Sequence, residues 1–247
     1  PGIWDRLFVQ KKIDIVKYAD GYILLTESMK YPLNIGSRPY CVVEGFLPET
    51  EYINIPCRVS SKKTIMYAGS LNKVFGICHL VDAFTRINDS EYELWICGCG
   101  SGKAYVKKMA KIDKRITYYG YVSRKRVGEL QKRATVLINP RRNMGEYTRY
   151  SFPSKTLECM VSGKPTIMYK LDGIPDEYDR YLYYVCDNEV DTLKDRIIEI
   201  CSKPEKELMH FGQEARKWAL SRKNNKRQAS AVLNLINTIL NTGGTYS

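Results

Sequence analysis

The strongest constraint on the fold is an alternation of strand-like and helix-like segments that begins at residue 64. Runs rich in β-branched and aromatic residues, such as 64–69 (TIMYAG) and 92–98 (YELWICG), end in glycine. Between them, apolar residues recur at helical spacing, as in 77–87. The same pattern predicts strands at 115–120, 135–140, 165–169 and 181–187, and helices at 102–112, 123–134 and 153–162. Strands that alternate with helices of this length form a parallel sheet covered on both faces, so the sequence predicts an α/β, doubly wound fold.

The two ends of the chain depart from this alternation. Strands are expected near the start at 21–26 (GYILLT) and 40–45 (YCVVEG), after an initial helix, and the residues after 189 are expected to be helical throughout. The prolines and polar residues of 48–62 are typical of a linker. We therefore divide the chain into residues 1–47, a linker at 48–62, a sheet domain at 63–222, a helix at 223–240 and a disordered tail at 241–247.

The net charge and the cysteines limit the partners and the cellular compartment that we expect for the chain. The net charge of +12 fits nucleic acid, an anionic membrane surface or phosphorylated ligands, but no nucleic-acid-binding motif accompanies it, so nucleic acid is the least favoured partner. Eight cysteines, mostly inside apolar runs, favour buried thiols in the reducing cytoplasm. Cys97 and Cys99 are the one close pair, and neither His79 nor His210 has a partner at zinc spacing, so no metal site is expected.

The chain has no initiator Met, no cleavable leader at its charged start and no apolar run of about 18 residues. We therefore expect an incomplete fragment or a processed product that does not span a membrane.

One predicted helix, within 150–165 (YSFPSKTLECMVSGKP), has an unusual polar face. Pro153 suits the first helical position and Gly163 the position after the end. A buried stripe is predicted at Leu157, Met160 and Val161. The polar residues that share the opposite face are Ser151, Ser154, Lys155, Glu158 and Ser162.

This polar face suits a nucleoside diphosphate. A helix amino terminus attracts phosphate, and the Ser151 and Ser154 hydroxyls and the Lys155 ammonium would add donors. Glu158, one turn deeper, would accept hydrogen bonds from a ribose diol. The alternative is a capped surface helix with a Lys155–Glu158 ion pair, and spacing alone leaves both open. The helix follows the carboxyl end of a strand, where sheets of this kind bind ligands, which favours the first interpretation.

Five motifs occur in the order expected for one family. They are YAGSL (67–71), ICGCG (96–100), YYGYV (118–122), LINP (137–140) and LECMVSGKPTI (157–167). Over residues 64–240 the chain resembles the donor-binding, Rossmann-like carboxyl-terminal half of a GT-B glycosyltransferase of the retaining family 4 type, also called glycosyl transferases group 1. SFPSKTLE (151–158) resembles a capsule and exopolysaccharide subgroup. Residues 12–45 resemble the end of the acceptor domain, and 223–240 the helix that crosses back onto it.

The resemblance implies a metal-independent transferase that moves a sugar from a nucleotide-sugar donor with retention of configuration. The donor is expected to be a UDP-sugar rather than a GDP-sugar, with no other cofactor. The acceptor would be a saccharide or a lipid-linked saccharide in bacterial-type surface polysaccharide synthesis. The protein would be cytoplasmic, with peripheral contact at an anionic inner membrane face. A nucleotide-sugar epimerase of the same architecture and a non-catalytic nucleotide- or nucleic-acid-binding module are the alternatives.

The resemblance also assigns site residues. Those expected to bind the donor are Gly69, Ser70, Tyr121, Ser151, Ser154, Lys155, Glu158, Asp172 and Gly173. Lys155 and Arg149 are the expected catalytic cations, with Lys73 a weaker third candidate. From the residues alone, a capping aromatic explains Tyr121 equally well, and a plain turn explains Asp172 and Gly173.

Two departures from the family pattern concern charge. Members carry Arg and Lys in the first loop, and the matching residues here are Ser70 and Phe75. The first of two family glutamates falls on Tyr150, while the second matches Glu158. Glu146 is a candidate for the missing carboxylate.

Overall fold

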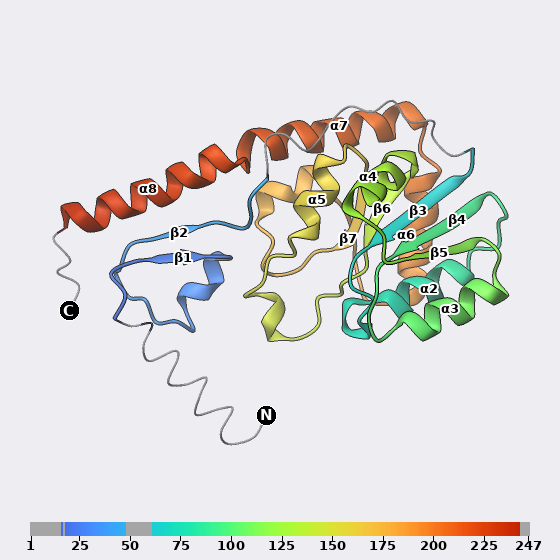
Figure 1. The fold of residues 1–247 in the computed structure, drawn as a ribbon, viewed down its shortest axis with the longest axis horizontal. Coiled ribbons are helices and arrows are strands. Elements are labelled where there is room, and N and C mark those ends of the chain that lie inside the picture. Colours follow the sequence, from blue (N-terminus) through green and yellow to red (C-terminus); the bar gives the residue numbers. More distant parts are fainter. Residues whose placement is uncertain (1–15, 17, 48–60, 243–247) are drawn as a thin grey trace, which may run out of the picture.

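The computed structural model describes residues 16, 18–47 and 61–242, and its main body is a six-stranded parallel sheet (Figure 1). The strands lie in the order β5-β4-β3-β6-β7-β8. The chain adds β4 and β5 on one side of β3 and then β6, β7 and β8 on its other side, so the strand order changes sense between β3 and β6. Their bounds are Lys63–Ala68 (β3), Tyr92–Cys97 (β4), Ile116–Gly120 (β5), Val136–Asn139 (β6), Thr166–Tyr169 (β7) and Tyr183–Val185 (β8). Each matches a strand expected from the sequence.

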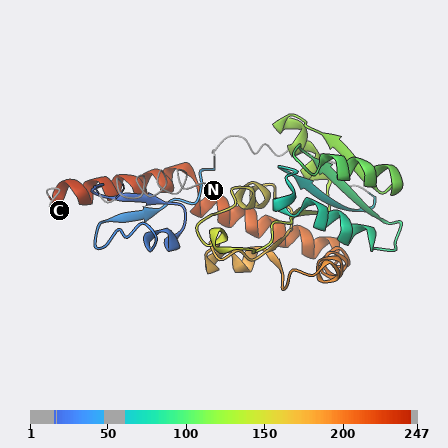
Figure 2. The same cartoon turned by 90° about the horizontal axis from the view of Figure 1, so that it is seen from below.

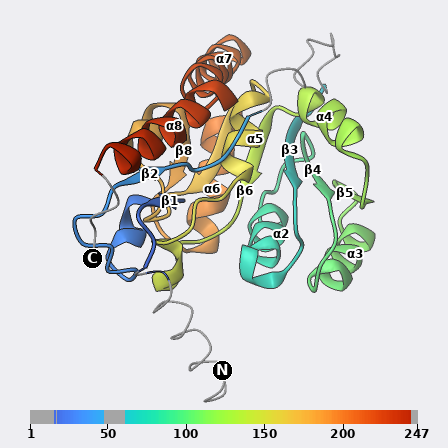
Figure 3. The ribbon, with the colours of Figure 1, turned by 60° about the vertical axis from the view of Figure 1, so that its left-hand side comes forward.

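Helices cover both faces of this sheet (Figure 3). On one face α2 packs against α3 and α6, and on the other α5 packs against α7. The helices are Ile77–Thr85 (α2), Lys103–Ile112 (α3), Arg124–Arg133 (α4), Lys155–Val161 (α5), Val190–Cys201 (α6), Glu205–Arg222 (α7) and Asn225–Asn241 (α8). The predicted doubly wound α/β fold with a helical carboxyl-terminal segment is therefore confirmed.

Alternating strand residues build a core on each side of the sheet. In β3, Ile65 belongs to the large cluster that includes Leu80 of α2, whereas Met66 belongs to a second cluster with Leu130 of α4 and Cys159 of α5. Because both faces are covered, the central strands β3, β6 and β7 are buried at consecutive positions rather than at every second one.

The amino-terminal residues form a separate parallel pair, β1 (Tyr22–Leu24) and β2 (Tyr40–Val42). α8 runs away from the six-stranded sheet and packs against β2, so the pair and this helix lie together at one end of the molecule (Figure 2). Ion pairs connect the amino-terminal segment to the main body of the protein at the point where α7 meets α8. There Lys223 contacts Glu44 at 2.5 Å and Glu177 at 2.7 Å.

The helix with the polar face begins later than predicted. α5 starts at Lys155, not at Pro153, because the Pro153 carbonyl accepts only a short-range bond from the Thr156 N–H (2.8 Å). The first bond of α-helical span runs from the Glu158 N–H to the Ser154 carbonyl. Gly163 does lie just past the end, with φ +77°. The initial helix, most of the linker at 48–62 and most of the tail at 241–247 lie outside the described residues.

Candidate functional site

The loops that follow β3 and β4 pack closely against each other at glycine residues, at the carboxyl end of the sheet. The Gly69 N–H bonds to the Cys97 carbonyl at 3.0 Å, and a Cβ atom on Gly98 would lie 1.8 Å from the Gly69 carbonyl oxygen. Gly98 also has φ +132°, which L side chains rarely adopt. Gly98 is therefore required by the close approach of the two loops, and this contact fixes the position of the β3 loop.

Lys155 reaches this β3 loop from α5. Its Cε lies 3.5 Å from where a Cβ atom on Gly69 would be. The Tyr67 hydroxyl donates to the Ser70 carbonyl at 2.7 Å, and burial raises the pKa of Tyr67, so this donor stays protonated. The loop therefore presents a fixed backbone beside a lysine from an element far away in the sequence.

Lys155 also forms the ion pair that the alternative interpretation expected. Its Nζ lies 2.7 Å from Glu158 Oε2, and both side chains remain 42 % exposed. A pair this exposed contributes about 0–1 kcal/mol, so a ligand could open it at little cost. Ser154 is exposed and makes no capping hydrogen bond, which departs from a capped surface helix.

Ser151 is engaged by a cation that the sequence analysis did not select. Arg141 Nη2 donates to Ser151 Oγ at 2.9 Å. The same guanidinium lies over the rings of Phe75 (5.6 Å) and Tyr147 (5.4 Å). The available signal was the Arg pair at 141–142 directly after the strand at 135–140, but spacing does not show which way a loop side chain turns.

Asp172 and Gly173 lie in the loop after β7, beside the loop after β6. Asn143 Nδ2 donates to Asp172 Oδ1 at 2.7 Å. A Cβ atom on Gly173 would lie 2.5 Å from the Ser151 carbonyl oxygen. The loop after β7 thus packs directly on the loop after β6, so these two residues share the edge with Ser151.

The carboxylate of Glu146 lies beside Tyr150, which matches the family's first glutamate. The Tyr150 hydroxyl donates to Glu146 Oε1 at 3.0 Å, and this bond raises the pKa of Tyr150. Arg149 is exposed, and its carbonyl accepts a hydrogen bond from Thr26 Oγ1 at 3.0 Å. Arg149 therefore lies where the amino-terminal segment meets the site loop.

Tyr121 stands apart from this group. It follows β5 at the same end of the sheet and is 84 % exposed. The contacts above link Gly69, Lys155 and Glu158 around the loop that holds Ser70, and in the described part of the chain Ser151 joins this loop only through Arg141, which covers Phe75. None of these contacts involves Tyr121.

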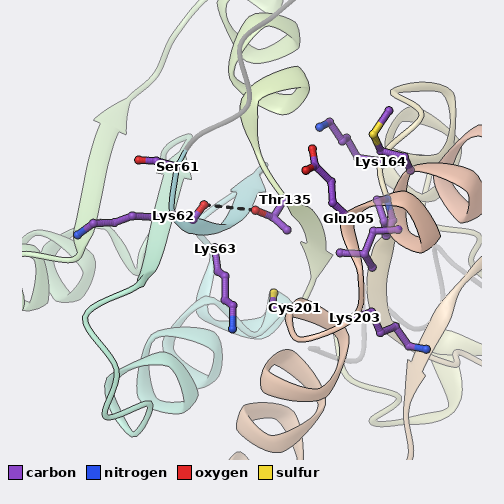
Figure 4. A pocket seen from close by; sticks show the side chains of 11 residues that line it. Ser61, Lys62, Lys63, Thr135, Lys164, Cys201, Lys203 and Glu205 are labelled. Atoms are coloured by element: carbon purple, nitrogen blue, oxygen red, sulfur yellow. Dashed lines mark hydrogen bonds between the residues drawn. The ribbon is translucent and has the colours of Figure 1, made fainter.

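A pocket of about 200 Å³ opens at the opposite, amino-terminal end of the sheet (Figure 4). Lys62, Lys63, Lys164 and Lys203 line it, but Figure 4 shows their ammonium groups pointing in different directions. They do not converge on a common point, so the arrangement in the pocket does not form a shared anion site. Within the described ranges, no three His, Cys, Asp or Glu side chains are grouped to hold a metal ion.

Comparisons with known proteins agree with this architecture. Residues 49–218 match the family model described as Glycosyl transferases group 1. Curated protein sequences give no significant match.

Solved structures resemble the chain in fold. A variant of S. aureus TarM in complex with fondaparinux, α-GlcNAc-glycerol and UDP is 18% identical, with TM-score 0.72 over 92% of this chain and 46% of TarM. Anabaena HepE in complex with UDP is 13% identical (TM-score 0.72, 93% and 66%). Sucrose-phosphate synthase from Thermosynechococcus elongatus is 16% identical (TM-score 0.70, 94% and 61%). The chain thus spans about half to two thirds of these proteins, and the likeness confirms the carboxyl-terminal half of a GT-B fold.

Proposed function

Because the chain belongs to the glycosyl transferases group 1 family, we propose that it binds the nucleotide-sugar donor for transfer of a sugar to a saccharide acceptor. The observation that carries the proposal is the meeting of Lys155 with the Gly69 loop at the carboxyl end of the sheet. A cation beside fixed backbone groups would stabilise the diphosphate that leaves as the sugar is transferred. Arg149, which is exposed at the same edge, is the second candidate for this role.

Within this proposal the donor is a UDP-sugar. Two solved neighbours, TarM and HepE, were determined with UDP, which supports uridine over guanosine. Lys155 would contact the diphosphate and Glu158 the ribose, which requires their 2.7 Å ion pair to open or rearrange. The remaining donor contacts would come from Ser151, Ser154 and the 172–173 turn, with Tyr121 beside the base.

We further propose that transfer retains the anomeric configuration and needs no metal ion, as the family resemblance implies. The acceptor would be a lipid-linked saccharide of a surface polysaccharide, reached from the inner face of the membrane. No helix within the described part of the chain is long and apolar enough to cross a membrane.

Charge supports a membrane-facing location. Residues 103–133 hold eleven Lys and Arg and two Asp and Glu, so they carry a net +9 of the chain's +12. These residues form α3, β5 and α4 at one edge of the sheet, and anionic lipid attracts such basic surfaces. At low salt the chain is expected to sediment together with phosphatidylglycerol vesicles. Phosphatidylcholine vesicles are expected to leave it in solution, and equal sedimentation with both would contradict an electrostatic contact.

The alternatives are less well supported. An epimerase is expected to place histidines at the ligand, but His79 is buried against the Tyr169 hydroxyl (2.8 Å), where burial lowers its pKa, and His210 lies on α7. A nucleic-acid-binding module would have to bind through the basic residues of 103–133 alone, because no nucleic-acid-binding motif accompanies them.

A panel of nucleoside diphosphates tested by thermal unfolding distinguishes these functions, because a ligand that binds the folded state raises the melting temperature. We expect UDP to stabilise the chain and uridine to stabilise it less. No response to any nucleoside diphosphate, together with salt-sensitive RNA binding, would instead favour the binding module.

A further inference from the structure

Arg141 is held at the site by three groups from two loops. Its guanidinium carbon lies 5.6 Å from the Phe75 ring centroid and 5.4 Å from that of Tyr147, and its Nη2 donates to Ser151 Oγ. Phe75 belongs to the loop after β3, and Tyr147 and Ser151 to the segment between β6 and α5. The side chain is therefore fixed between the two loops that flank the carboxyl ends of β3 and β6.

No acidic side chain among the described residues neutralises the charge of Arg141. Arg141 forms no ion pair of 4.0 Å or less with any residue that the structure describes. Its Nε is buried without a hydrogen-bond partner among those residues. A guanidinium stays protonated in proteins, so within the described part of the chain Arg141 places a positive charge without an acidic partner at this edge.

The ring beneath this charge is the one that replaces a cation. Phe75 is the residue that matches the Lys of the family's first loop, and Arg141 covers its face. We propose that Arg141 supplies from the β6 loop the diphosphate-binding cation that the β3 loop lacks. The inference rests on the proposed function, because it concerns the same donor. Arg141 and Lys155 then flank Ser151 in sequence and would approach the diphosphate from the β6 loop and from α5.

Arg141→Ala tests the contact by calorimetric titration. Loss of a charge-assisted contact is expected to weaken UDP binding about ten- to a hundredfold and uridine binding less than about threefold. Arg133→Ala is the matched control, because Arg133 also covers an aromatic ring (Trp95, 5.4 Å) but lies at the end of α4. It is expected to leave UDP affinity within about twofold. Equal losses for uridine and UDP in Arg141→Ala would overturn the assignment.

A rescue experiment separates binding from packing. In Arg141→Ala/Phe75→Lys the cation returns to the position that the family uses, while both partners of the cation–ring contact are gone. We expect UDP affinity to recover at least about fivefold over Arg141→Ala, with no recovery of melting temperature. If the double variant binds UDP no better than Arg141→Ala, the cation replacement is wrong even though the proposed function stands. If the unaltered chain binds no UDP, both fail.

Discussion

Removal of the Lys155 ammonium tests whether the polar face of α5 binds a diphosphate or only solvent. If Lys155 contacts the diphosphate, Lys155→Ala removes a charge-assisted contact of roughly 1.5–3 kcal/mol, or about ten- to a hundredfold in affinity. The ion pair with Glu158 offsets little of this, because both side chains are 42 % exposed and such a pair contributes about 0–1 kcal/mol.

A surface helix gives a different result. If the pair were only an exposed i,i+3 contact, Lys155→Ala would change the free energy of unfolding by about 0.2–0.5 kcal/mol and leave ligand binding unchanged. Stability alone therefore does not decide between the interpretations, whereas affinity does.

Calorimetric titration with uridine and with UDP is the assay. We expect Lys155→Ala to weaken UDP binding strongly and uridine binding slightly. Glu158→Gln keeps the shape but loses the charge, and because the ribose is common to both ligands, it is expected to weaken both alike. Equal losses for uridine and UDP in Lys155→Ala would refute the phosphate role even if binding fell.

Two further predictions concern the frame of the site and are measured by urea unfolding. Gly98→Ala places a Cβ atom 1.8 Å from a backbone oxygen at φ +132°. It is expected to destabilise the fold by well over the about 1–2 kcal/mol expected for the control Gly120→Ala, where φ is +75° and no atom lies close. Equal losses of stability in the two variants would show that the loop shifts to accommodate the methyl group. Lys223→Ala leaves the carboxylate of Glu44, 5 % exposed, without its ion-pair partner and is expected to cost about 3–5 kcal/mol. Glu177→Ala, at 47 % exposure, is expected to cost less than about 1 kcal/mol, and a similar cost for both would contradict the buried-pair argument.

The sheet could be predicted from the sequence because its signal is local. Runs such as 64–69 and 135–140 are rich in β-branched and apolar residues, and turn signals separate them from helices with a single apolar stripe. Leu157, Met160 and Val161 were expected to be buried and are 2%, 0% and 1% exposed.

The site could be predicted only in part, because loops take their shape from what they pack against. Helical spacing placed Lys155 and Glu158 on one face, and they do lie together. The turn of Arg141 toward Phe75 depends on a contact between residues 66 positions apart, which no local pattern encodes. The Ser154 hydroxyl makes no capping bond, because the backbone of Ser154 is already helical (φ −50°, ψ −28°) rather than extended, which the residue type does not reveal.

We propose that the donor binds at the carboxyl end of the sheet, and amide hydrogen exchange with and without UDP measures where it binds. We predict slower exchange in 69–76 and 141–158 when UDP is present, with no change around the lysine-lined pocket at 61–63 and 201–209. Protection confined to that pocket, or no protection in either region at saturating UDP, would contradict the account.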